Sequence, residues 1–171
     1  MLFRSVPDIV TMGKPMGNGL PIAGLVARQD VLDDFGRNAR YFNTFGGNPV
    51  CVAAASAVLD VLEAERLPAN AAATGAYLRD GLARLAAGSQ VLGDVRGAGL
   101  YLGIDVADPA TGAPSADLAA VIVNRMRERH VLISATGPQG SVLKVRPPLP
   151  FGPEHADQFL AALAEVTAGL G

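Results

Sequence analysis

The sequence predicts an α/β protein in which helices cover one face of a small, mostly antiparallel sheet. Of the 171 residues, 50% are hydrophobic and 18% are charged, a composition typical of a globular protein with a substantial core. Four long segments repeat apolar residues every three or four positions, as amphipathic helices do. After residue 90 the expected order is strand, helix, strand, strand, helix, which favours one layer of helices on one sheet.

The N-terminal part is expected to be rich in loops. Residues 7–12 form a short apolar run bounded by proline and glycine, which predicts a strand buried on both faces. Glycine and proline are frequent in residues 13–24, so a constrained loop follows. A second strand over 22–27 and a short helix over 31–35 complete this part.

Two helices are predicted in the middle of the chain. Asn48 followed by Pro49 marks a helix start, because asparagine caps free N–H groups and proline needs no partner at the first position. Apolar residues from Val50 to Leu62 predict one buried stripe. A second helix is expected over 67–86, where small residues would permit another helix to approach closely.

The C-terminal part alternates between strands and helices. Apolar and polar residues alternate over residues 100–106, as in a strand with one buried face. The elements expected after it are a helix over 115–129 capped by Ser115, strands over 131–134 and 142–146 joined by a turn at 137–140, and a helix over 153–168.

Composition excludes several classes of function. The formal net charge of -2 argues against nucleic-acid binding, which needs clustered lysine and arginine. No apolar run is long enough for a membrane span, and the single cysteine, Cys51, is expected to be a buried, reduced thiol of a cytoplasmic protein. His130 and His155 are expected at the surface near helix ends, and two histidines without paired spacing argue against a metal site.

The first candidate site residue is Lys14, one of only two lysines among the 14 basic residues; the other is Lys144. Lys14 follows a predicted strand and is held between glycine and proline, so it points into the edge where open α/β sheets bind ligands. A lysine can capture a carbonyl as a Schiff base if its surroundings lower its pKa. A solvent-exposed loop lysine is an equally good interpretation of position alone.

Two further candidates bind anions. Thr44 lies beside Gly46 and Gly47 just before a predicted helix, where free N–H groups and the helix dipole attract phosphate, although plain helix capping explains the same residues. Arg146 ends a strand and precedes two prolines, which suits bidentate recognition of a carboxylate. A charged residue that protects an edge strand is the competing explanation for Arg146.

Four segments together resemble the class III aminotransferases, which are fold type I enzymes that use pyridoxal 5'-phosphate. They are PDIVTMGKPMGNGLPI at 7–22, YFNTFGGNP at 41–49, GDVRGAGL at 93–100 and LKVRPPL at 143–149. The resemblance covers nearly the whole chain but only the C-terminal half of the family's sequence. The sequence GKPMGNG at 13–19 is similar to that of a subgroup of alanine-glyoxylate-type aminotransferases and ethanolamine-phosphate phospho-lyases.

The resemblance implies a role for each candidate. Lys14 would form the Schiff base with the cofactor and later move the proton between substrate and cofactor. Thr44 would bind the cofactor phosphate across the interface of a homodimer, and Arg146 would hold the substrate α-carboxylate. The substrate would be a small amino acid or amine. The reaction would transfer the amino group of a donor to a keto acid or aldehyde acceptor, or, in the phospho-lyase alternative, eliminate phosphate.

The resemblance also implies a division of the chain. Residues 1–49 would be a remnant of the large cofactor-binding domain, 50–66 a connecting helix, and 67–171 the small C-terminal α/β domain. The family's upstream half supplies the aspartate that pairs with the cofactor ring, so we expect this chain to be inactive by itself. It would need a full-length relative or an N-terminal half, or else be a non-catalytic fragment that mediates dimerisation.

Overall fold

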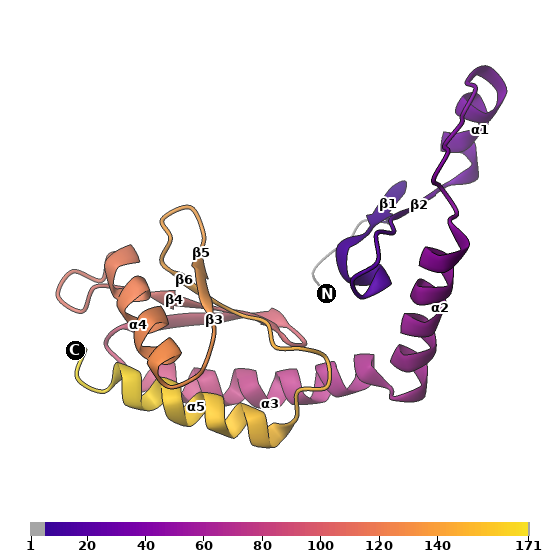
Figure 1. Ribbon diagram of the computed structural model, residues 1–171. Helices are drawn as coiled ribbons and strands as arrows, with labels where there is room; N and C mark the ends of the chain where they lie inside the picture. The colour runs from indigo at the N-terminus through magenta and orange to yellow at the C-terminus, as the bar shows by residue number, and fades with distance from the viewer. Residues whose placement is uncertain (1–5, 171) are drawn as a thin grey trace. The chain divides into compact units, whose positions relative to one another are not determined.

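The computed structural model describes residues 6–170 (Figure 1). The chain divides into two compact units, Met1–Glu65 and Arg66–Gly171. Residues 1–5 and 171, which belong to the predicted domains 1–49 and 67–171, lie outside the described residues. Within the described range, no helix combines the length and the apolar character that a membrane crossing requires.

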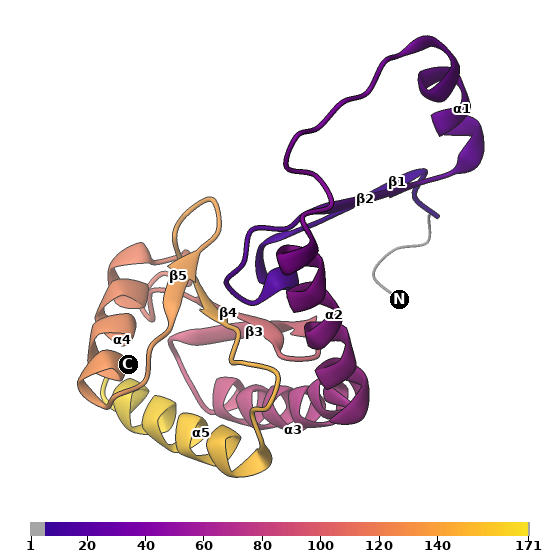
Figure 2. The ribbon, with the colours of Figure 1, turned by 45° about the vertical axis from the view of Figure 1, so that its right-hand side comes forward.

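The first unit contains a two-stranded hairpin followed by two helices. Its elements are β1 (Ile9–Met12), the 3-10 turn η1 (Lys14–Gly17), β2 (Gly24–Ala27), α1 (Gln29–Asn38) and α2 (Pro49–Ala64). β1 and β2 lie side by side (Figure 2). They are antiparallel, with Ile9 opposite Ala27 and Met12 opposite Gly24. The predicted second strand and short helix are therefore confirmed, and the predicted loop contains a single short turn.

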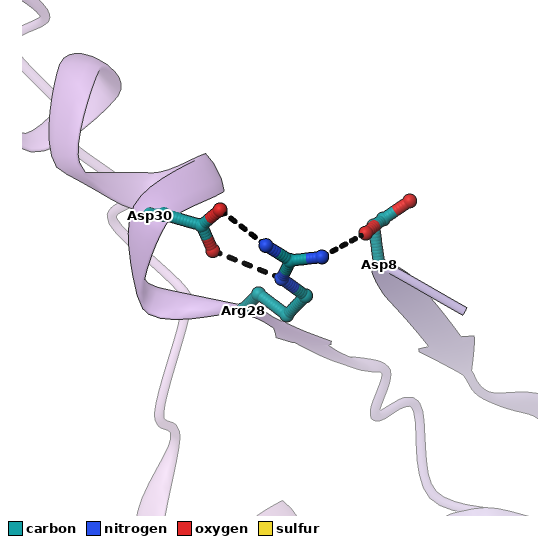
Figure 3. Close-up of polar contacts among 3 residues, drawn as sticks. All are labelled: Asp8, Arg28 and Asp30. Carbon is teal, nitrogen blue, oxygen red and sulfur yellow. Dashed lines mark hydrogen bonds and ion pairs between the residues drawn. The ribbon is translucent and has the colours of Figure 1, made fainter. Parts of the chain in front are cut away.

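An exposed polar cluster lies at the end of the hairpin where α1 begins (Figure 3). The Arg28 guanidinium donates to Asp8 from Nη1 at 2.9 Å and to Asp30 from Nε at 3.0 Å. The backbone N–H of Arg28 also donates to the carbonyl oxygen of Asp8 at 3.0 Å. Because all three side chains are more than half exposed, solvent screens these ion pairs and each contributes little to stability.

The prediction that the first strand is buried on both faces is wrong. All four residues of β1 are exposed, with Ile9 at 49%, Val10 at 41% and Met12 at 44%. A parallel strand needs neighbours on both sides and covering layers, whereas β1 has one antiparallel neighbour in this unit. Its apolar side chains are consequently left uncovered by the described residues.

The start of α2 is as predicted, but its buried stripe is not. Asn48 Oδ1 accepts hydrogen bonds from the N–H groups of Val50 at 3.0 Å and Cys51 at 3.3 Å. Ala55 is the one residue of α2 that is buried, Val50 is 65% exposed, and Cys51 is half-buried where the sequence predicted full burial. Within this unit the short turn η1 packs against α2, and one turn covers only a small part of a long helix.

The second unit confirms the predicted layer of helices on an antiparallel sheet. The strands are β3 (Leu92–Ala98), β4 (Tyr101–Val106), β5 (Ser134–Thr136) and β6 (Val142–Val145), in the spatial order β3-β4-β6-β5. The helices are α3 (Leu67–Ala87), α4 (Ala116–Glu128) and α5 (Pro153–Thr167). All neighbouring strands in this sheet are antiparallel.

One face of this sheet forms the core. Leu102, Ile104 and Val106 of β4 are buried together with Leu143 and Val145 of β6. Helices α3 and α4 pack against the strands, and α5 packs against both of these helices. Tyr101 of β4 belongs to the opposite face and is 61% exposed. The alternation over residues 100–106 therefore predicted correctly which side chains enter the core.

β3 was not predicted from the sequence, and the strand that corresponds to β5 was predicted too early in the chain. β3 is an edge strand, and its register with β4 shifts between Leu92 and Val95. A bulge breaks the period of two that identifies a strand in a sequence. β5 begins at Ser134, where the predicted strand over 131–134 ends. The residues that pair with β6 are Ser134 to Thr136, so the strand lies there.

Glycines let α3 approach its neighbours closely. A β-carbon at Gly81 would collide with the side chain of Leu160 on α5, which confirms the expected close approach of another helix. A β-carbon at Gly75 would instead collide with the backbone of Gly99, in the turn between β3 and β4. The small residues of α3 therefore serve a helix on one side and a tight turn on the other.

Candidate functional site

Lys14 is the first residue of η1 and is separated from β1 by Gly13. Its side chain is exposed, and its backbone has a φ of 55°, in the left-handed region that few residues other than glycine adopt. Backbone strain of this kind is concentrated at functional sites. The Lys14 amine therefore lies in a constrained turn. The described residues leave it exposed, whereas a nucleophilic lysine was expected to be buried.

Thr44 lies in an ordered turn that leads into α2. The Asn43 side chain accepts hydrogen bonds from the N–H groups of Phe45 at 3.1 Å and Gly46 at 2.9 Å, which fixes the turn around Thr44. Gly47 has a φ of 71°, so the chain reaches the helix N-cap through a conformation that favours glycine. Thr44 itself is exposed, close in sequence to the positive end of the α2 dipole.

Two loops, one from the segment 7–22 and one from the segment 41–49, meet at the N-terminus of α2. A cavity of about 400 Å³ is lined by residues 21–23, by Asn43 and residues 45–48, and by Cys51 and Val52 of the first turns of α2. The loop that follows Lys14 and the loop that holds Thr44 therefore share a wall, although neither Lys14 nor Thr44 lines the cavity itself.

Arg146 lines a separate cavity in the second unit. It follows β6 directly and is exposed. The cavity has a volume of about 520 Å³, and Lys144, His130 and His155 also line it. No aspartate or glutamate is among its lining residues, so its charged and titratable groups are all cations or histidines. Such a cavity is suited to an anionic ligand.

The two histidines are the site residues that the sequence did not reveal. Both are exposed, as expected, but they line the cavity that contains Arg146. His130 ends the α4 region and His155 lies in the first turn of α5, so 25 residues separate them in the chain. The packing of α5 against α3 and α4 accompanies their meeting at one cavity, and sequence spacing carries no signal of this.

The three candidate residues are divided between the units. Lys14 and Thr44 belong to Met1–Glu65, and Arg146 belongs to Arg66–Gly171. Each unit therefore holds some of the predicted site residues, with the Lys14 amine and the turn of Thr44 in the first and a cavity lined by cations in the second.

Comparison with known proteins identifies the family. The family model described as aminotransferase class-III matches residues 2–167. An alanine-glyoxylate aminotransferase 2-like protein of Drosophila melanogaster is 44% identical over 94% of this chain, and an ethanolamine-phosphate phospho-lyase homolog of Caenorhabditis elegans is 40% identical over 94%. A solved phospholyase from Arthrobacter, in complex with phosphoethanolamine, is 47% identical with a TM-score of 0.95 over 99% of this chain.

These relatives are much longer than the matched region. The chain spans 33% of the Drosophila protein, 35% of the Caenorhabditis protein and 40% of the Arthrobacter structure. The match nevertheless extends over nearly all of the present sequence, and it includes all four segments that resemble the family. This chain therefore belongs to the class III aminotransferase family.

Proposed function

We propose that this chain supplies the lysine, the phosphate-binding turn and the carboxylate-binding arginine of a pyridoxal-phosphate-dependent aminotransferase. The observation that carries the proposal is the family match over residues 2–167, which contains Lys14, Thr44 and Arg146 in their motifs. A solved amine transaminase from an uncultivated Pseudomonas species, 32% identical, is described as PLP-bound in its internal aldimine form. Its likeness to this chain supports the same cofactor here.

The first unit has groups that fit pyridoxal phosphate. Lys14 has an accessible amine for the cofactor aldehyde, and Thr44 offers a hydroxyl to the phosphate in a turn before a helix N-terminus. The neighbouring N–H groups of Phe45 and Gly46 are already bound to Asn43, so the proposal assigns the phosphate to the Thr44 hydroxyl rather than to these two donors. When bound, the cofactor supplies an electron sink for a substrate carbanion.

Residues of this chain would perform two further tasks. Arg146 would hold the substrate carboxylate through two parallel N–H donors, which fixes the orientation of the reacting carbon. The Lys14 amine, once released by the substrate, would remove the proton from that carbon and return it during the second half of the reaction. The substrates would be a small amino acid or amine as donor and a keto acid or aldehyde as acceptor.

We propose that activity requires a further polypeptide segment or partner chain. The chain spans about a third of its curated relatives, and the hairpin exposes Leu25 at 57% and Val26 at 59% as well as the apolar residues of β1. Such uncovered apolar strands are typical of surfaces that another segment covers. A homodimer, a full-length relative or an N-terminal half would provide that cover, and a non-catalytic fragment that only mediates dimerisation is the alternative.

We further propose the domain division that the sequence predicted. Residues 1–49 would belong to a large cofactor-binding domain, 50–66 to a connecting helix and 67–171 to the small domain; the boundary between the compact units at Glu65 supports the last assignment. A cytoplasmic location is part of the same proposal, because one cysteine allows no internal disulfide.

Covalent trapping tests the proposed lysine. The 171-residue chain is mixed with pyridoxal phosphate and reduced with borohydride, which converts the lysine–aldehyde linkage into a stable secondary amine that mass spectrometry can map. We expect modification at Lys14, loss of this peptide signal in Lys14→Ala, and retention of it in Lys144→Ala, the matched control at the only other lysine. Equal labelling of both lysines would contradict a formed site.

The cationic cavity of the second unit favours a second candidate, a phospho-lyase. Lys144 and Arg146 line it without any carboxylate, and two such cations suit a phosphate dianion as well as a carboxylate. The chain would be combined with the upstream half of a relative and given either phosphoethanolamine or an amino acid with a keto acid. Release of inorganic phosphate would support elimination, whereas transfer of the amino group to the keto acid would support the aminotransferase.

A further inference from the structure

The segment that carries Arg146 has few hydrogen bonds of its own. It runs from Arg146 to Gly152, between β6 and α5, and Pro147, Pro148 and Pro150 have no N–H group to donate. Within it the Phe151 N–H donates to the Pro148 carbonyl at 3.0 Å, and the Gly152 N–H donates to His155 Nδ1 at 3.0 Å. The carbonyl groups of Leu149 and Phe151 receive their hydrogen bonds from outside the segment.

Asn70, in the first turns of α3, supplies these donors. Its side-chain Nδ2 donates to the carbonyl oxygen of Leu149 at 2.7 Å and to that of Phe151 at 3.1 Å. A side-chain amide has two N–H donors, so both are used. Two acceptors on one side of the amide also establish which atom is nitrogen and which is oxygen.

Thr74 fixes the orientation of the Asn70 amide. Its hydroxyl donates to Asn70 Oδ1 at 3.2 Å, one helical turn further along α3. Thr74 is 3% exposed, so water does not compete freely for this hydrogen bond. The amide is thus held from the helix side by Thr74 and binds the proline-rich segment on its other side.

We propose that Asn70 is a positioning residue that holds Arg146 and the adjoining cavity wall in place for anion binding, an inference that rests on the proposed role of Arg146. The segment is held at its start by β6, where Val145 pairs with Leu102, and at its far end by Asn70. Two prolines with fixed φ lie between, so an anchor at Leu149 limits the freedom of Arg146. Phe151, the second carbonyl held by Asn70, lines the same cavity as Arg146.

The test uses the whole 171-residue chain, labelled with ¹⁵N, in four variants. Asn70→Ala removes both donors, and Asn70→Asp keeps the shape of the side chain but turns an acceptor toward two carbonyl oxygens. Tyr77→Phe is the matched control, because it removes a hydroxyl of the same helix that donates to Asp157 of α5 at 2.6 Å rather than to the segment. Arg146→Ala reports separately on the proposed function.

Two measurements are made on each variant. The heteronuclear NOE of the Leu149 and Phe151 amides reports the order of the segment, and titration with inorganic phosphate, followed at the Arg146 side-chain resonance or at neighbouring amides, reports anion binding. Both Asn70 variants should lower the NOE of these amides and weaken phosphate binding about tenfold or more, the usual effect of losing a supporting hydrogen bond behind a binding residue. Tyr77→Phe should change neither.

The outcomes separate the two proposals. An unchanged NOE at Leu149 and Phe151 in Asn70→Ala, or an equal loss of phosphate affinity in Tyr77→Phe, would overturn the role of Asn70. Phosphate binding that is absent in the unmodified chain, or that survives in Arg146→Ala, would overturn the proposed anion-binding role of Arg146. In that case the NOE comparison still decides whether Asn70 anchors the segment.

Discussion

Replacing Gly75 by alanine tests the closest approach in the second unit. The added β-carbon would lie 2.7 Å from Gly99 Cα and still closer to the Gly99 carbonyl, all of them backbone atoms. Gly99 has a φ of 53° in the turn between β3 and β4, and the strand ladder on both sides prevents this turn from moving away freely. Gly99 also belongs to the third segment that resembles the family.

The expected loss of stability is a difference between two effects. Overpacking a tight site costs about 1–3 kcal/mol, and the collision with backbone places Gly75→Ala at the upper end of this range. Alanine stabilises a helix interior by about 1 kcal/mol relative to glycine, so the net loss should be about 2 kcal/mol. Gly81→Ala gains the same helix term but meets only side-chain atoms of Leu160, which can rotate, and its net effect should be close to zero.

Urea denaturation of the two variants measures this difference. The amide resonances of Leu102 and Ile104 in β4 report on unfolding of the second unit, where both substitutions lie. Equal stability of Gly75→Ala and Gly81→Ala would refute the reasoning, because the two changes differ only in what the new methyl group meets. A free energy loss confined to Gly75→Ala would establish the contact of α3 with the turn.

Two further predictions concern local hydrogen bonds. Ser115→Ala removes the hydroxyl that accepts from the Leu118 N–H at 3.3 Å, so urea denaturation should show a loss of about 1 kcal/mol, whereas an unchanged midpoint would mean that the cap contributes nothing. The hydroxyl and N–H of Thr111 lower the pKa of Asp108 below its ordinary 3.8, so this contribution to stability is present above pH 3.8 and is lost as the pH falls through the folded-state pKa. NMR titration should show the Asp108 pKa rising in Thr111→Ala, and a pKa that stays low would contradict this cause.

Features that depend on neighbouring residues in the chain were predictable from the sequence. The caps at Asn48 and Ser115 need only a side-chain oxygen and an N–H group two or three residues later, and both form as expected. The alternation around Ile104 identified the buried face of β4 because side-chain direction in a strand follows from its period of two. Local geometry is encoded locally, so reading along the chain is sufficient for it.

Burial was predictable only where the partner surface belongs to the same compact unit. The apolar residues of α3 and α5 are buried because they pack on each other and on the sheet. The apolar runs of β1 and α2 have the same sequence character, but β1 is exposed and α2 is mostly exposed, with Ala55 its one buried residue. An amphipathic pattern states that a face is suited to burial, and it contains no information about what covers that face.

The sequence by itself determined the family and the residues that carry its motifs, because Lys14, Thr44 and Arg146 lie in segments whose order and wording are distinctive. The tertiary structure alone decided what surrounds them. It brings His130 and His155 to the cavity of Arg146, and it sets Asn70 against Leu149 across 79 residues of chain. Contacts between residues so far apart arise from packing and hydrogen bonding in three dimensions, and no local pattern in the sequence records them.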